Sequence, residues 1–259
     1  MIKEGQIASQ TAEEHIPSPS EIATMERQVA AETRSKYPEL VELASDVIAV
    51  FPAAFSIIDS PDRKVPSQDI VVTMFATEAH FTIRCGYELL MKGYYAQAQV
   101  LNRLLMEEYM LARYYHCHPK KAVKYYNKNA RTSGMNEVLK SLNLDHLYSD
   151  YEQLSGHTHS RLYSIWTTVV DAETSTGLRL RSASVYDGEL FLQCMQFWAK
   201  YATAFLQFLA QVFQPLFEAP EFVTQVATLL ERTKIFLDQR QRNATARLQA
   251  TSSAQSVTG

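Results

Sequence analysis

Residues 93–115 read GYYAQAQVLNRLLMEEYMLARYY, and this stretch decides the fold class of the 259-residue chain. Gly93 is a typical helix terminator, and no glycine or proline follows it until Pro119, so one long helix is expected between them. Its apolar residues occupy two sides, with Val100, Leu101, Leu104, Leu105 and Leu111 on one side and Met106 and Met110 on the other. Because a helix that is apolar on both sides is enclosed by other elements, we predict a central helix.

The composition of the whole chain favours the same class. Only 8 residues are glycine, and few glycines allow few tight turns, which disfavours a β-sandwich or a barrel. Hydrophobic residues make up 46% of the chain, which excludes global disorder. The net charge of -3 gives no general electrostatic affinity for nucleic acids or anionic membranes.

We therefore predict an all-α, single-domain helical bundle over residues 18–242. Ser20 is the expected N-cap of its first helix, and residues 1–17 and 243–259 are expected to be disordered tails because they are polar. One short β-hairpin-like excursion is expected near residues 162–185. There, LYSIWTTVV and GLRLRSASV alternate with a period of two on either side of a polar turn.

A second long apolar helix is expected over residues 190–213. Its polar residues form one narrow line: Gln193, Gln196, Lys200, Thr203, Gln207, Gln211 and Gln214. A surface helix of a monomer would need a wider polar face. Two explanations remain open, namely that this helix forms the interface of a homodimer or that it is the centre of the bundle.

The cysteines and the chain's apolar runs bear on its location. Cys85, Cys117 and Cys194 are far apart and lack metal-ligand spacing, so reduced core thiols are expected. The N-terminus has no apolar signal segment, and the longest apolar run, near residues 47–58, is too short to cross a bilayer. We expect a soluble cytoplasmic protein without a membrane partner.

Charged residues on the central helix are the first candidates for a functional site. Arg103 and Glu107 are four residues apart, so they share a helix face and can pair. Glu108 points to another side and needs its own partner, because burying an unpaired carboxylate costs several kcal/mol. The pair Arg103–Glu107 is either an internal ion pair that fixes helix packing or part of a ligand site.

A second polar segment, YEQLSGHTHSR at residues 151–161, is the expected partner of that pair. One carboxylate cannot satisfy the five donors of an arginine, so Arg103 needs further acceptors. We predict that Arg103 and Glu107 meet Ser155 and either His157 or His159 in a shared polar pocket. If they do, replacing Arg103 by alanine should cost several kcal/mol, because Glu107 would stay buried without a partner.

These two segments together resemble an uncharacterised family of all-helical bacterial proteins, known mainly as a domain of unknown function. The family pattern is a glycine, a helix with Arg-x-x-x-Glu, and a Tyr-x-x-Leu-Ser segment that ends in histidine. It maps onto Gly93, Arg103, Glu107, Tyr151, Leu154, Ser155 and one of His157 or His159. The resemblance implies a helical fold in which these side chains meet, and it implies no activity.

A second resemblance concerns Arg113-Tyr-Tyr-His-Cys-His118, which is similar to the Arg-x4-6-His motif of HEPN-type ribonucleases of defence and toxin systems. In that reading His118 is the acid or base, Arg113 holds the scissile phosphate, and RNA is the partner. Tyr114 replaces the usual polar residue after the arginine. The basic residues that follow fit RNA or simply form a solvated helix face: Lys120, Lys121, Lys124, Lys128 and Arg131.

Other site types are poorly supported by the sequence. There is no phosphate-binding or dinucleotide-binding glycine motif, no nucleophile elbow and no Glu-x-x-His pair of a di-metal centre. A single metal site could still assemble from Glu78, Glu107, Glu108, His157 and His159, but we expect no metal and no cofactor. The sequence does not decide whether the protein is an enzyme.

Overall fold

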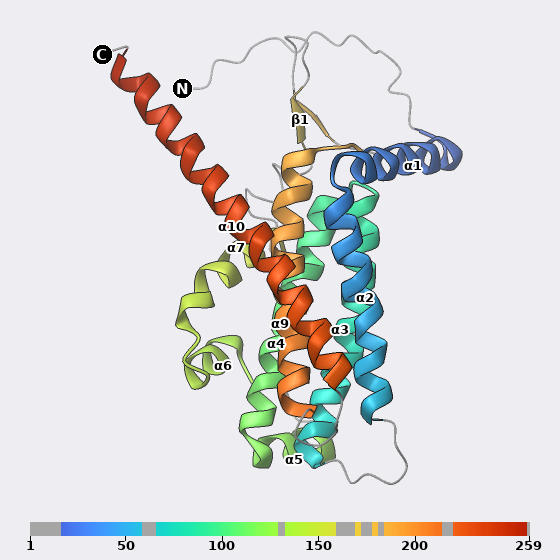
Figure 1. Cartoon of the computed structure of the whole chain (residues 1–259), viewed down its shortest axis with the longest axis vertical. Coiled ribbons are helices and arrows are strands. Elements are labelled where there is room, and N and C mark those ends of the chain that lie inside the picture. Colours follow the sequence, from blue (N-terminus) through green and yellow to red (C-terminus); the bar gives the residue numbers. More distant parts are fainter. Residues whose placement is uncertain are drawn as a thin grey trace, which may run out of the picture.

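The computed structural model describes residues 17–58, 66–128, 133–158, 169–171, 178–180, 184–213 and 220–257. Its fold is all-α, as predicted (Figure 1). The helices are α1 (Pro19–Lys36), α2 (Pro38–Ile58), α3 (Ser67–Met91), α4 (Tyr95–Cys117), α5 (Pro119–Lys128), α6 (Met135–Ser141), the short 3-10 helix η1 (Asp145–Leu147), α7 (Tyr148–Thr158), α9 (Gly188–Phe213) and α10 (Pro220–Val257). None of the described helices is both long and apolar enough to cross a bilayer.

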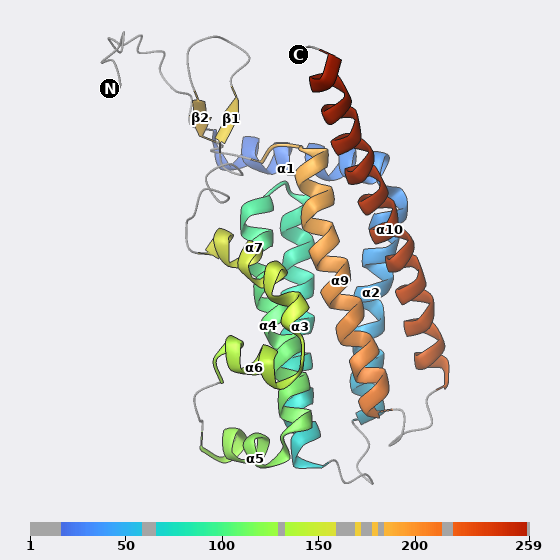
Figure 2. The same ribbon diagram turned by 90° about the vertical axis from the view of Figure 1, so that its left-hand side faces the viewer.

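The long helices α2, α3, α4 and α9 run side by side, and α10 lies along α2 and α9 (Figure 2). Helices α5, α6 and α7 pack on α4, while α1 crosses one end of the bundle. Helix α4 therefore contacts neighbours on several sides, which confirms the prediction from its two apolar faces.

Helix α9 is the centre of the bundle. It contacts α2, α3, α4 and α10, and most of its side chains are buried. Trp198 is 1% exposed, and its indole Nε1 donates a hydrogen bond to the carbonyl oxygen of Ile83 at 3.0 Å. The second explanation of its narrow polar line is therefore correct, and α9 is not available as an exposed dimer interface.

A tight turn at Gly93 joins α3 to α4. The φ angle of Gly93 is 77°, which lies in the left-handed region that only glycine adopts without strain. A Cβ atom at this position would lie 2.7 Å from the carbonyl oxygen of Val185. Gly93 thus ends α3 as predicted and also lets the chain before α9 approach the turn closely.

Three expectations about chain ends and turns need comment. The N-cap of α1 is Ser18 rather than Ser20, and it forms a capping box with Glu21. The expected hairpin is confirmed by two antiparallel strands, β1 (Val169–Asp171) and β2 (Leu178–Leu180). Residues 243–257, expected to be a disordered tail, instead continue α10. They are rich in alanine, glutamine and arginine, which favour helix, and contain no glycine or proline.

The expectation of three buried thiols is wrong for two of them, since Cys85 and Cys117 are exposed and only Cys194 is buried. Cys85 lies on α3, where the apolar pattern also includes Met74 and Phe81, and both of these are exposed as well. Cys117 is the last residue of α4. The apolar pattern of α3 therefore extends from the core onto an outer face of the molecule.

Candidate functional site

The predicted pair on α4 forms and reaches α7. Arg103 Nε donates to Glu107 Oε1 at 2.9 Å, and a terminal guanidinium nitrogen donates to the Tyr151 hydroxyl at 3.2 Å. The guanidinium also lies over the Tyr151 ring, 5.2 Å from its centroid. The side chains of Arg103 and Glu107 are 15% and 26% exposed. The structure therefore brings together the two segments that the sequence analysis paired.

The other predicted members of this cluster are only partly described. Ser155 lies one turn beyond Tyr151 and is buried, and its hydroxyl has no hydrogen-bond partner among the described residues. The side chain of His157 and the whole of His159 lie outside the described residues. Contact between Arg103 and a histidine therefore stays a prediction.

A second polar link joins α7 to the central helix. Lys200 Nζ lies 2.5 Å from Asp150 Oδ2, and the Tyr201 hydroxyl donates to the same oxygen at 2.6 Å. Sequence reasoning missed this link, although Lys200 is the one cation in the polar line of α9. Together, Arg103 and Lys200 fix α7 against the bundle from two sides.

The nuclease candidates on α4 are held in separate contacts. Arg113 donates to the Tyr109 hydroxyl at 3.0 Å. His118 stacks on Tyr114 with 4.4 Å between ring centroids, and its Nδ1 lies 2.8 Å from the Tyr114 carbonyl oxygen. Because a carbonyl only accepts, this Nδ1 carries the proton. Nε2 then accepts from the Ser141 hydroxyl at 3.1 Å.

Both ring nitrogens of His118 are thus occupied, and among the described residues no hydrogen bond joins it to Arg113. The basic stretch after it is partly neutralised too, because Lys121 pairs with Glu137 at 2.7 Å and also bonds the Tyr114 hydroxyl. These contacts describe a well-bonded corner between α4, α5 and α6.

Glu108 is buried between α4 and α3. Its Oε1 accepts from the Thr82 hydroxyl at 3.0 Å, and its Oε2 has no partner among the described residues. Burial raises the pKa of Glu108 to about 8, and the nearby carboxylates Glu78 and Glu107 add to this rise. A group that is largely protonated at neutral pH is a poor metal ligand, and the described side chains contain no cluster of three or more metal-ligating residues.

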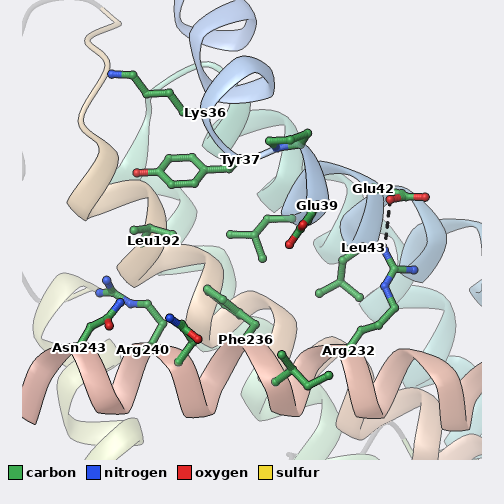
Figure 3. Close-up of a pocket in the computed structure, with 14 residues that line it drawn as sticks. Lys36, Tyr37, Glu39, Glu42, Leu43, Leu192, Arg232, Phe236, Arg240 and Asn243 are labelled. Carbon is green, nitrogen blue, oxygen red and sulfur yellow. Dashed lines mark ion pairs between the residues drawn. The ribbon is translucent and has the colours of Figure 1, made fainter.

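A pocket of about 740 Å³ lies on another part of the molecule, between the start of α2, α9 and α10 (Figure 3). Its walls combine apolar and charged side chains: Lys36, Tyr37, Pro38, Glu39, Leu40, Glu42, Leu43, Leu192, Arg232, Ile235, Phe236, Gln239, Arg240 and Asn243. Its volume falls in the range of roughly 300–1,000 Å³ that is typical of small-molecule sites.

Two arginines on α10 stand at the two ends of this pocket, with Phe236 between them (Figure 3). Arg232 is neutralised, since it lies 2.5 Å from Asp46 and 3.8 Å from Glu42. Arg240 has one terminal nitrogen 2.6 Å from Glu189 Oε1, but its Nε is buried without a hydrogen-bond partner among the described residues. One side of the Arg240 guanidinium therefore retains a free donor.

Comparisons with protein-family models, curated proteins and solved structures find no match for this chain. The two resemblances of the sequence analysis therefore stay expectations, and the site has to be judged on its own geometry.

Sequence reasoning missed the pocket. Its walls come from three segments that lie far apart in the chain, around residues 36–43, 192 and 232–243. The assumed end of the fold at residue 242 also left out Asn243, which closes one end. The only available signal was the pattern of α10, where Arg232, Phe236 and Arg240 recur every four residues and so share one face.

Replacing Arg103 by alanine is expected to lower the free energy of unfolding by about 1–2 kcal/mol, measured by urea denaturation. This is less than the several kcal/mol expected from sequence, because Glu107 is 26% exposed and water can solvate it once its partner is gone. Glu107→Gln should cost less, since the amide oxygen still accepts from Arg103. An equal or larger loss for Glu107→Gln would contradict the pairing as the source of stability.

Proposed function

We propose that the protein binds a small amphipathic molecule with a carboxylate group in the pocket between α2, α9 and α10. The observation that carries this proposal is the buried, unpartnered Nε of Arg240 at the end of an otherwise apolar wall. A buried donor without a partner costs roughly 1–3 kcal/mol, and a ligand acceptor would recover that cost.

The apolar part of such a ligand has a surface to bury. Leu40, Leu43, Leu192 and Phe236 line the space from three helices. Tyr37 stiffens the rim, because its ring stacks on Phe191 with 5.2 Å between centroids. A hydrocarbon chain or a ring system would remove these side chains from water, which is the main source of affinity in apolar pockets.

The charged end of the ligand is assigned to Arg240. Nε and an adjacent terminal nitrogen of a guanidinium form a planar edge that matches the two oxygens of a carboxylate. Glu189 already accepts from one terminal nitrogen, and it is itself shared with Arg247 at 3.0 Å. Lys36 at the opposite rim adds positive charge.

The network of Arg103, Glu107 and Tyr151 has a structural role in this proposal. The described contacts of Arg103 run to its own helix and to α7, and they hold two elements of the bundle together. The geometry lends less support to the alternative, an RNA endonuclease, because both nitrogens of His118 are engaged in local hydrogen bonds.

Cis-parinaric acid, a fluorescent fatty acid, is a suitable probe. We expect a saturable rise in its fluorescence with the wild-type protein, and an apparent Kd that is at least about tenfold higher for Arg240→Gln, because a charge-assisted hydrogen bond is lost. The matched control is Arg242→Gln, which changes an exposed arginine of α10 that does not line this pocket.

The methyl ester of the probe separates charge from packing. It should bind wild type and Arg240→Gln equally, because it lacks the carboxylate. Thermal melts confirm that each variant is folded. Equal affinities of Arg240→Gln and Arg242→Gln for the free acid, or no saturable binding by wild type, would overturn the proposal.

A further inference from the structure

One face of α3 carries large apolar side chains that no described element covers. Phe81 is 56% exposed, Met74 44% and Ile70 36%. The neighbouring helix α4 adds exposed Val100 and Leu104. Isolated exposed apolar residues are common, but a set that recurs along one helix face and continues on the next helix indicates an interaction surface.

Two opposite charges flank Phe81 on the same face. Glu78 and Arg84 are exposed, and neither has an ion-pair partner among the described residues. They lie six residues apart, so they cannot pair within the helix, where neighbours are three or four residues apart. Each is therefore available to a charge from outside the chain.

We propose that this face binds a second copy of the chain, with the two α3 helices antiparallel and a two-fold axis at Phe81. In such an arrangement, a residue before position 81 faces the residue equally far after it on the other copy. Glu78 and Arg84 are each three residues from Phe81, so each would face the other's counterpart and two ion pairs would form. Thr77 would face Cys85 in the same way.

This charge pattern selects a second copy as the occupant. An isologous interface must be self-complementary, and the face of α3 meets that condition with an apolar centre and opposite charges at equal distances from it. The pocket at α2, α9 and α10 lies on other helices, so this inference does not depend on the proposed ligand.

The wild-type chain should show twice its mass of 29.5 kDa in light scattering at micromolar concentration. Phe81→Asp should give the monomer mass, because it places two carboxylates at the axis. The matched control is Ile235→Asp, which changes an equally exposed apolar residue of α10 and should leave the dimer intact. Circular dichroism verifies that both variants are folded.

Charge reversal tests the register of the interface. Glu78→Arg alone and Arg84→Glu alone should each raise the dimer Kd by about tenfold, because each converts two attractive pairs into two repulsive ones. The double variant should restore the wild-type Kd, and mixing the two single variants should favour a heterodimer. Glu231→Arg, a charge reversal on exposed α10, should have no effect.

A monomeric wild-type chain would overturn the proposal. A dimer that survives Phe81→Asp would place the interface elsewhere and would also overturn it. A dimer that is lost with Phe81→Asp but is not restored by the double charge reversal would contradict the two-fold axis at Phe81.

Discussion

Replacing Trp198 by alanine is expected to lower the free energy of unfolding by about 3–5 kcal/mol. The indole lies at the point where α9 meets α3, beside Gly86 and 6.0 Å from the ring of Tyr87. Its removal would leave a cavity in the centre of the bundle and would leave the Ile83 carbonyl without this donor. Urea denaturation at neutral pH measures the loss.

The variant Trp198→Phe separates the two contributions. It keeps an aromatic ring in the space but loses the indole donor, so a smaller loss of about 1–3 kcal/mol is expected. If alanine and phenylalanine cost the same, the hydrogen bond rather than packing would dominate, contrary to the expectation for a fully enclosed ring.

Stability is expected to fall as the pH rises from about 4.5 to about 8, through the ionisation of Glu108. The folded-state pKa of about 8 lies above the ordinary value of 4.5, so the unfolded chain releases this proton first. The stabilising contribution is therefore complete below pH 4.5 and is lost as the pH rises through 8. The shift corresponds to about 3–5 kcal/mol.

Glu108→Gln tests this directly, because glutamine keeps an acceptor for Thr82 and does not titrate. Its free energy of unfolding, measured between pH 5 and 9, should exceed that of wild type increasingly as the pH rises. The control Glu231→Gln, on exposed α10, should keep the wild-type pH profile. Parallel profiles for wild type and Glu108→Gln would show that the carboxylate is already ionised in the fold.

Sequence patterns predicted the helices better than their surroundings. The two apolar sides of α4 and the glycine before it identify a central helix, because propensity and periodicity are local properties. The same pattern on α3 predicted burial for Met74 and Phe81, which are exposed. Periodicity defines an apolar face, but whether another helix of the same chain covers that face depends on tertiary packing.

The candidate sites show the same division. The spacing of Arg103 and Glu107 sufficed to predict their ion pair, since four residues bring two side chains onto one helix face. The partner Tyr151 is 48 residues away, and only the resemblance connected its segment to α4. The pocket around Arg240 depends on the docking of α10 against α2, which no local pattern encodes.

The short connection at Gly93 has a consequence for how the chain folds. Helices α3 and α4 form the most extensive helix pair among the described elements, and they can meet as soon as both have been synthesised, because closing a short loop costs little entropy. Helix α9 contacts them only across about 100 residues of sequence, as its bond from Trp198 to Ile83 shows. The hairpin of α3 and α4 is thus suited to act as the folding nucleus, with the docking of α9 as the later step.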